Sequence, residues 1–246
     1  MEKKILKLMS FRLSGKFAAF RKFYSNSSSL SYYIPPRTAL AGMFASILEI
    51  ARNEYYEIFS PKVCGISVCI ETPLKRKIHS MNYLDNIDGL ISQHSQCKLE
   101  VVSAKDGGLI RYRVYLAAND DSFLSTFEDL AKHIESQNLG YGIYLGQRQF
   151  IAEIDEFHIC DSVQYLEKSG EIHSICREDH VVSFKSEDGI ILCSDNIPLD
   201  MIKTENEQIR KTTRSERIIF EQNGKVVKGE FQNCYKADGK VIGFFE

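Results

Sequence analysis

The sequence has no apolar run that approaches the roughly 18 residues of a membrane-spanning helix. Its first residues carry charge, but the apolar stretch that follows is too short for a secretory signal. The seven cysteines are an odd number scattered without a disulfide framework, which favours a reducing compartment. We therefore expect a cytoplasmic protein with no membrane contact.

Motifs of nucleotide-dependent and hydrolytic enzymes are also missing. There is no GxxxxGK[ST] phosphate loop, no GxGxxG after an expected strand, no GxSxG and no HExxH. Four residues have zinc-binding side chains, but their order and gaps match no common zinc arrangement; they are Cys160, His173, Cys176 and His180. The cysteines lie in strand-like apolar runs, where thiols usually pack as small hydrophobic groups. We predict no cofactor and no metal site.

The chain does have enough apolar sequence for a core, because 43% of its 246 residues are hydrophobic. Its net charge of −2 is unevenly distributed. Within residues 1–40 the single acid is Glu2, against Lys3, Lys4, Lys7, Arg12, Lys16, Arg21, Lys22 and Arg37. This excess favours a localised anion-binding face on an otherwise acidic body, although a solvated basic strand and loop fits the same pattern.

The first part of the chain shows strand-like and helix-like patterns in turn. Residues 5–13 alternate as in a strand, and apolar positions from Pro36 to Ala51 recur at three–four spacing, as on one face of a helix. Proline suits the first turn of a helix, where an amide has no intrahelical partner. A second strand is expected at 63–70. The polar excursion at 74–108 that follows favours a long hairpin.

A further strand, helix and strand follow the excursion. Residues 110–116 alternate as a half-exposed strand, and Asp120 or Asp121 can cap the next helix. The apolar stripe of that helix comprises Phe123, Phe127, Leu130, Ala131 and Ile134. Residues 140–154 predict a glycine-rich turn that leads into a strand. The resulting order is βαββαβ, the ferredoxin-like order of an antiparallel sheet with two helices on one face.

From about residue 159 the pattern changes to short strand-like runs. Three dipeptides separate them: Asp188-Gly189, Asn223-Gly224 and Asp238-Gly239. The latter two are hairpin signals. We therefore predict an α+β fold in two parts. A ferredoxin-like, RRM-like domain at 1–158 carries the hairpin insertion at about 74–108, and a small antiparallel all-β domain follows at 159–246.

A metal-independent ribonuclease is one function that these residues could support. Cleavage of RNA needs a base, an acid and a cation at the phosphate. Lys77 and His79 lie two residues apart, so an extended backbone points both to one face, where Tyr24 and Tyr33 could join them. Basic and aromatic residues near a basic loop also fit simple phosphate contacts, and we favour that interpretation.

Several stretches together resemble one known family. FRLSGKFAAFRKFYS at 11–25 and SYYIPPRTALAGMFASILE at 31–49 are similar to the N-terminal signature of the CRISPR-associated Cas protein, family five, of the RAMP superfamily. YGIYLGQRQFIAEI at 141–154 resembles the end of its ferredoxin-like domain, and NIPLDM and RSERIIFEQNG resemble its C-terminal β region. The resemblance covers almost the whole chain and points to subtype I-B.

This resemblance implies an RNA-binding structural subunit of a type I Cascade surveillance complex in antiviral defence. In the family, the loop after the first strand and the first turn of the first helix hold the 5′ handle of the crRNA, and the long hairpin forms a thumb. Helix N-termini and arginine bind phosphate, and aromatic rings, here including Tyr32, stack on unpaired bases. The RNA-binding residues implied are Gly15, Lys16, Phe17, Arg21, Tyr24, Tyr33, Arg37, Thr38, Arg76, Lys77, His79 and Arg148.

The resemblance also implies partners. The chain would cap a row of backbone subunits of the family-seven type, contact a large subunit of the family-eight type, and meet target DNA only through the complex. The alternative is an endoribonuclease that processes CRISPR repeat RNA, as in the I-C branch, which uses a tyrosine, a lysine and a histidine. That set does not map onto this chain, since Lys132 and His133 lie on the second expected helix. We expect no catalytic residue. An unrelated RNA-binding ferredoxin-like protein is a third interpretation.

Overall fold

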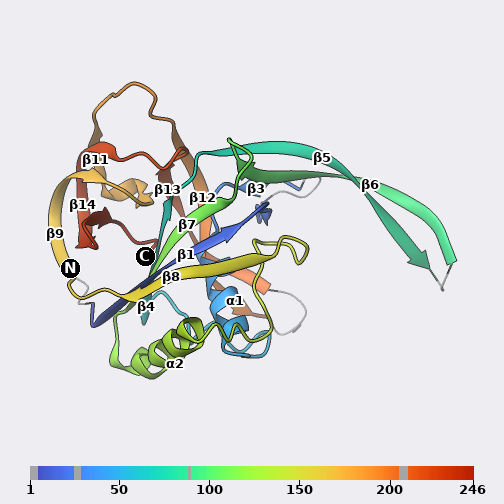
Figure 1. Cartoon of the computed structure of the whole chain (residues 1–246), viewed down its shortest axis with the longest axis horizontal. Helices are drawn as coiled ribbons and strands as arrows, with labels where there is room; N and C mark the ends of the chain where they lie inside the picture. The colour runs from blue at the N-terminus through green and yellow to red at the C-terminus, as the bar shows by residue number, and fades with distance from the viewer. Residues whose placement is uncertain (1–4, 25–28, 88–89, 205–209) are drawn as a thin grey trace.

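The computed structural model describes residues 5–24, 29–87, 90–204 and 210–246. Lys3 and Lys4 of the basic N-terminal segment lie outside these residues. The described elements are a central sheet with two helices, a long projecting hairpin, and a set of C-terminal strands (Figure 1).

A four-stranded antiparallel sheet forms the centre of the molecule. Its strands lie in the order β4 (Cys64–Ile70), β7 (Ile110–Ala118), β1 (Lys7–Gly15) and β8 (Ala152–Ile159). The helices α1 (Arg37–Ile47) and α2 (Leu124–Glu135) follow β1 and β7 in the chain. The predicted order strand, helix, strand, excursion, strand, helix, strand is therefore present.

The alternation of β1 decides what each face of the sheet contacts. Met9, Phe11 and Leu13 share one hydrophobic cluster with Phe44 of α1 and Phe127 of α2, so both helices pack on that face. The rings of Phe11 and Phe44 meet edge to face at 6.1 Å between their centroids. The intervening residues of β1 point to the opposite face. There, Leu8 packs in a separate cluster with residues of the C-terminal strands.

The two helices begin and end for local reasons. Helix α1 starts after Pro36 and ends four residues before the predicted Ala51, because Glu49 adopts a left-handed φ of +57° and the amide of Ile50 bonds back to the carbonyl of Ala45. Before α2 lies one 3-10 turn, η1 (Asp121–Phe123), in which the carboxylate of Asp120 accepts from the amide of Ser122. Asp120 therefore caps this turn, while α2 itself begins at Leu124 without a side-chain cap.

The polar excursion is a long antiparallel hairpin of β5 (Leu74–Ile87) and β6 (Leu90–Ala104), which projects from the body in Figure 1. Its base is part of the core, since Leu99, Val101 and Val102 are buried. A short pair, β2 (Phe20–Arg21) and β3 (Ser31–Tyr32), lies beside this base, and Ala18 bridges to Val102. The predicted thumb is therefore a hairpin whose apolar base cannot be removed without loss of core.

The C-terminal strands form two further sheets. One has the order β10 (Cys176–Arg177), β13 (Arg210–Glu221), β12 (Leu192–Lys203). In the other, β14 (Val227–Ala237) pairs with β9 (Gln164–Ile172), β11 (Val181–Phe184) and β15 (Lys240–Ile242). A short 3-10 turn, η2 (Glu178–His180), precedes β11. Among the described residues, all strand pairs in this region are antiparallel, as predicted.

One of the two predicted C-terminal hairpins is correct. Asp238 and Gly239 have φ values of +52° and +73° and join β14 to β15 through a two-residue turn. The prediction for Asn223-Gly224 is wrong, because β13 and β14 on either side of it belong to different sheets. The positive φ of Gly224 instead lets the backbone approach the carbonyl of Ile70, where a Cβ would overlap.

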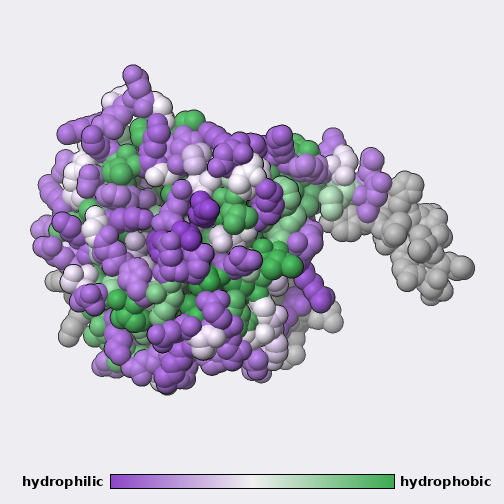
Figure 2. All heavy atoms as spheres, in the orientation of Figure 1, coloured by the Kyte–Doolittle hydropathy of each residue, from purple (hydrophilic) through white to green (hydrophobic). Residues whose placement is uncertain are grey.

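The C-terminal strands share the main core with the first part of the chain. Ile197, Ile218 and Phe245 lie in the same buried cluster as Phe44 of α1. Two backbone bonds, from Ile175 to Val68 and from Phe245 to Ile66, cover the outer edge of β4. No helix among the described residues is long and apolar enough to span a membrane. The surface in Figure 2 is largely hydrophilic, with an apolar area near the foot of the hairpin.

Candidate nucleic-acid interface

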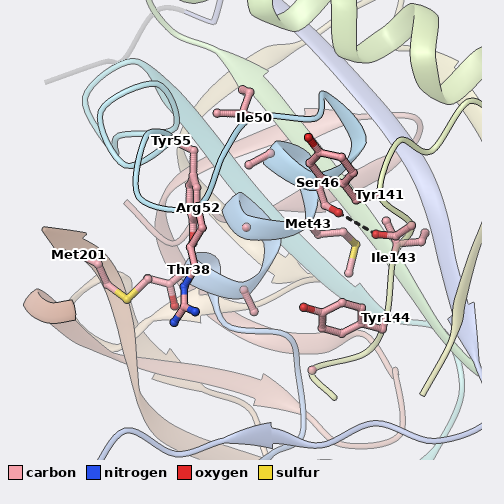
Figure 3. A pocket seen from close by; sticks show the side chains of 15 residues that line it. Thr38, Met43, Ser46, Ile50, Arg52, Tyr55, Tyr141, Ile143, Tyr144 and Met201 are labelled. Atoms are coloured by element: carbon pink, nitrogen blue, oxygen red, sulfur yellow. Dashed lines mark hydrogen bonds between the residues drawn. The ribbon is translucent and has the colours of Figure 1, made fainter. Parts of the chain in front are cut away.

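A groove of about 720 Å³ lies between α1, the segment that follows it and the glycine-rich loop before β8 (Figure 3). Its walls include Thr38, Ser46, Arg52, Tyr55, Tyr141 and Tyr144. Among the described residues that line it there is one cation and no carboxylate. An open groove with several aromatic rings and one positive charge can accept a planar, anionic ligand.

The glycine-rich loop is clamped at both ends and open in the middle. A Cβ at Gly140 would overlap the carbonyl of Ser46 at the end of α1, and one at Gly146 would overlap the carbonyl of Ala19. Gly142 has a φ of +88° and nothing within 4 Å of its Cβ position. Both of its backbone polar groups are held: its amide donates to the carbonyl of Leu139 at 2.8 Å, and its carbonyl accepts from Ser46 Oγ at 2.8 Å. The loop therefore presents bare backbone to the groove at a fixed place.

Tyrosines stand on both sides of this open backbone. Tyr141 is 72% exposed and Tyr144 46% exposed. Tyr55 is buried in the opposite wall, where its hydroxyl would lie 3.2 Å from a Cβ at Gly42. Gly42, inside the apolar stripe of α1, thus makes room for Tyr55 because it has no side chain. Arg52 and Tyr55 follow α1 in a segment without periodicity, so their place in the groove was not predicted from the sequence.

A second exposed area lies at the foot of the hairpin. Phe17 is 40% exposed, and its ring centroid is 6.0 Å from that of Phe150. Phe150 also packs on the small cluster of Ala19, Leu99 and Val101.

The basic residues of β5 face this same area. In the ladder of β5 and β6, Lys77 is paired with Val101 and His79 with Leu99. Paired residues point to the same face of a hairpin, so both side chains lie on the face that carries Leu99 and Val101. Arg148 is exposed in the loop just before Phe150. Of the predicted residues, Phe17, Lys77 and His79 therefore lie around this small cluster, and Arg148 is two residues before Phe150, which packs on it.

Two other predicted residues hold the opposite face of the hairpin. The guanidinium of Arg76 lies 4.1 Å from the centre of the Tyr33 ring and donates to the carbonyl of Ser31 at 3.0 Å. Glu100 lies 3.4 Å from the same guanidinium. The Tyr33 ring also meets Phe220 edge to face. These contacts fix the hairpin to β3, and they occupy one face of the Tyr33 ring and Nη1 of Arg76.

Arg37 is the clearest correction to the predicted site. It is 1% exposed, forms an ion pair with Glu246, and donates to the carbonyls of Phe59, Leu199 and Cys64 at 2.8, 3.2 and 3.1 Å. The prediction that Arg37 binds phosphate is wrong, because its donors are committed inside the core.

Tyr32 is also buried. Its hydroxyl donates to the carbonyl of Asn196 at 2.7 Å, and burial raises its pKa. Its ring cannot stack on a base.

The remaining predicted residues are spread around these areas. Gly15 is buried, where a Cβ would lie 2.7 Å from Leu145, so it serves packing against the loop. Lys16 is exposed and donates to the carbonyl of Gly107. Arg21 is exposed, Thr38 lines the groove, and Tyr24 is 48% exposed with its hydroxyl 3.3 Å from Asp195.

The predicted basic face is largely neutralised by the acidic remainder of the chain. Four cations of the N-terminal segment pair with carboxylates from later elements: Lys7 with Glu128, Arg12 with Asp155, Lys22 with Asp195, and Arg37 with Glu246. Most of the described positive charge in residues 1–40 therefore forms ion pairs within the fold, and less of it is left for an open anion-binding face.

The set of groups considered for RNA cleavage is not assembled among the described residues. Lys77 and His79 share one face of the hairpin, but Tyr33 contacts Arg76 on the other face. Tyr24 contacts Asp195.

The family of the chain follows from its sequence. The family model described as CRISPR-associated protein (Cas_Cas5) matches residues 8–218. The chain belongs to the Cas5 family of CRISPR-associated proteins. A comparison with curated proteins finds no match for this Cas5-family chain.

Solved structures share the fold of this Cas5-family chain. A CRISPR protein from Archaeoglobus fulgidus is 13% identical with a TM-score of 0.58, and the match covers 96% of this chain and 99% of that one. A chain of a CRISPR RNA-guided surveillance complex is 15% identical with a TM-score of 0.50, covering 92% of this chain and 91% of that one. At these identities the likeness concerns the fold alone.

Proposed function

We propose that this chain is a non-catalytic RNA-binding subunit of a type I Cascade complex and holds the 5′ handle of the crRNA in antiviral defence. The observation that carries the proposal is the glycine-rich loop, which joins the tyrosine-lined groove to the cationic foot of the hairpin. Single-stranded RNA is bound by aromatic platforms for its bases and by cations for its backbone. This surface offers both along one continuous path.

Each part of the surface has a role in this proposal. Tyr144 and Tyr141 stack on handle bases, which approach closely because Gly142 has no side chain. Arg52 pairs with a phosphate inside the groove. At the foot of the hairpin, Phe17 stacks on a further base, and Lys77 and Arg148 neutralise the backbone. The hairpin acts as the thumb, and Arg76 and Tyr33 keep it in position.

The partners in this proposal are those of the subunit's place in such a complex. We assign the central sheet and its helices to the ferredoxin-like, RRM-like RAMP domain, in a cytoplasmic assembly. The chain caps backbone subunits of the family-seven type and bridges to a large subunit of the family-eight type, and target DNA is met through the complex. Membership of the family and the shared fold support this place.

Binding of handle RNA at several salt concentrations tests the proposal. Tyr144→Ala should weaken binding by about 1–3 kcal/mol, the usual contribution of one stacked base. Arg148→Ala should reduce the slope of log K against log salt by about one phosphate contact. The matched controls are Phe184→Ala, an exposed aromatic on β11, and Lys168→Ala, an exposed cation on β9. If both test variants bind like the controls, the interface is elsewhere.

The alternative of a repeat-processing endoribonuclease is tested separately. Cleavage needs groups held to within about 0.5 Å of their reactive geometry, whereas phosphate binding tolerates looser placement. We expect end-labelled repeat RNA to be bound but not cut, with or without divalent metal, on a denaturing gel. Site-specific cleavage to a 2′,3′-cyclic phosphate that is lost in His79→Ala would identify this chain as the processing enzyme instead.

A further inference from the structure

Three potential metal ligands converge on the face of the central sheet opposite the helices. His158 lies near the end of β8, Cys160 follows that strand, and Asp238 lies in the turn between β14 and β15. Their ligand atoms all lie within 4.8 Å of one another. This cluster is separate from the groove and the hairpin foot, and none of its members belongs to the proposed RNA surface.

The contacts within the cluster centre on one carboxylate oxygen. Asp238 Oδ2 is 2.7 Å from His158 Nε2 and 3.2 Å from Cys160 Sγ. The hydroxyl of Ser10, which is fully buried on β1, lies 3.3 Å from the same histidine nitrogen and 3.5 Å from the same carboxylate oxygen. Four polar atoms thus surround one small volume.

A β-bulge places two of these ligands on the same side of the sheet. Between β1 and β8 the register shifts, so that Arg12 is opposite Asp155 but Ser10 is opposite His158. Glu156, in the bulge, has a left-handed φ of +48°. Without the extra residue, the side chain of His158 would point to the sheet face that carries the helices. The side chain of Cys160, two residues later, would point the same way. Bulges commonly re-aim side chains in this way at functional positions.

The third ligand is held by a different element. The two-residue turn of Asp238 and Gly239 has positive φ at both positions, which fixes the direction of the Asp238 side chain. The turn reaches β8 from a strand pair about 80 residues later in the chain. Three ligands on two rigid elements form a preorganised set rather than a chance meeting of long side chains.

The donor types and spacing fit zinc. Bond lengths of about 2.0–2.3 Å in a tetrahedral site put ligand atoms roughly 3.3–3.6 Å apart. Asp238 Oδ2 lies closer than this to the histidine nitrogen and the thiol sulfur, at 2.7 and 3.2 Å, because it is hydrogen-bonded to both, and all three ligand atoms lie within 4.8 Å of one another. A thiolate and a carboxylate together balance the charge of a divalent ion, and imidazole is a preferred third ligand. The side chains of His158 and Asp238 are 45% and 28% exposed, so an ion can enter.

We propose that His158, Cys160 and Asp238 form a binding site for one zinc ion, with a water held beside Ser10 in the fourth position. The ion replaces the protons that these groups now share and links β8 to the turn between β14 and β15. This site differs from the zinc arrangement considered in the sequence: Cys160 belongs to it, while His173 accepts from the amide of Val241 and Cys176 packs with Phe231.

Cobalt and zinc titrations of the full chain test this site. Co²⁺ bound to a thiolate in a tetrahedral site gives a charge-transfer band and intense visible bands, so we expect both with one equivalent of metal. Cys160→Ser should abolish the charge-transfer band. Cys97→Ser, which removes a partly exposed thiol on the hairpin, should leave it unchanged. His158→Gln and Asp238→Asn should each weaken Zn²⁺ affinity at least tenfold, with unchanged circular dichroism showing that they fold.

Two results would overturn the proposal. One is the lack of a charge-transfer band at a tenfold excess of Co²⁺. The other is a band that survives Cys160→Ser, since the metal would then be bound by other cysteines. As a second readout, Zn²⁺ should raise the unfolding temperature of the parent chain but not of Asp238→Asn. An equal rise in both would count against the site.

Discussion

Replacing Arg37 by alanine separates a structural role from an RNA-binding role. The sequence places this arginine at the first turn of α1, where a phosphate contact is the natural expectation. In the structure its side chain is buried and paired with Glu246, and it also donates to three backbone carbonyls. Glu246 in turn accepts from the amide of Ile66 at 3.1 Å. A structural role predicts that Arg37→Ala loses stability, whereas an RNA-binding role predicts that it loses RNA affinity.

The expected loss of stability follows from these contacts. Removing one partner of a buried ion pair typically costs about 3–5 kcal/mol, because the other charge stays buried without compensation. The three carbonyls also lose a charged donor, which places Arg37→Ala in the upper part of that range. Domains have about 5–15 kcal/mol of total stability, so the variant should lose a large fraction of it. For a chain of this length the unfolding temperature should fall by roughly 8–16 °C.

Urea unfolding and RNA binding of matched variants check this account. Lys77→Ala should keep stability within about 0.5 kcal/mol of the parent and reduce the salt slope of RNA binding. Arg37→Ala, measured below its unfolding temperature, should lose stability and keep the salt slope of the parent. The double variant Arg37→Met/Glu246→Gln should lose less stability than the sum of its single variants, by about 1 kcal/mol or more. An Arg37→Ala protein as stable as the parent, with a reduced salt slope, would refute the reasoning.

The remaining predictions concern the hairpin, the loop and one histidine. Replacing residues 83–95 by a short turn should leave thermal stability unchanged, because the buried base of the hairpin remains, but it should prevent assembly with crRNA. Deletion of 75–103 removes that base and should unfold the chain. Gly146→Ala should cost about 2 kcal/mol or more in urea unfolding, since a Cβ overlaps Ala19, whereas Gly142→Ala should cost about 1 kcal/mol for its φ alone. Burial lowers the pKa of His173 below its unfolded value, so the stability of the chain should fall as pH drops below about 6.5. His173→Gln should make this fall smaller. If the pH profile of stability is unchanged in the variant, His173 is not its source.

Much of the secondary structure could be predicted because it depends on local periodicity. The alternation of Met9, Phe11 and Leu13 identifies β1 and its buried face, and three–four spacing identifies the stripes of α1 and α2. The Asp238-Gly239 turn was predictable because its two positive φ values need those residue types. Asn223-Gly224 is an equally strong hairpin signal, but the strands on either side of it belong to different sheets, which tertiary contacts decide and the dipeptide does not encode.

The candidate site was less predictable because burial is decided over long distances. Arg37 and Tyr32 have the residue types of an RNA site, yet Glu246 and Asn196, far along the chain, hold them inside. The excess of positive charge in residues 1–40 suggested an open basic face for the same reason, since its carboxylate partners come from later parts of the chain. The tyrosines of the groove become a set only when the glycine-rich loop packs on α1.

The pairing of Arg37 with Glu246 also sets a lower limit on when the chain can fold during synthesis. Glu246 follows Arg37 by 209 residues, so at about 5–20 residues per second the arginine waits roughly 10–40 s for its partner. During that time α1 cannot settle on the sheet without burying an unpaired charge. The edge of β4 at Ile66 likewise waits for its partner Phe245, which is made later in synthesis. A chain that has not yet reached residue 246 therefore lacks the docked helix that forms one wall of the groove.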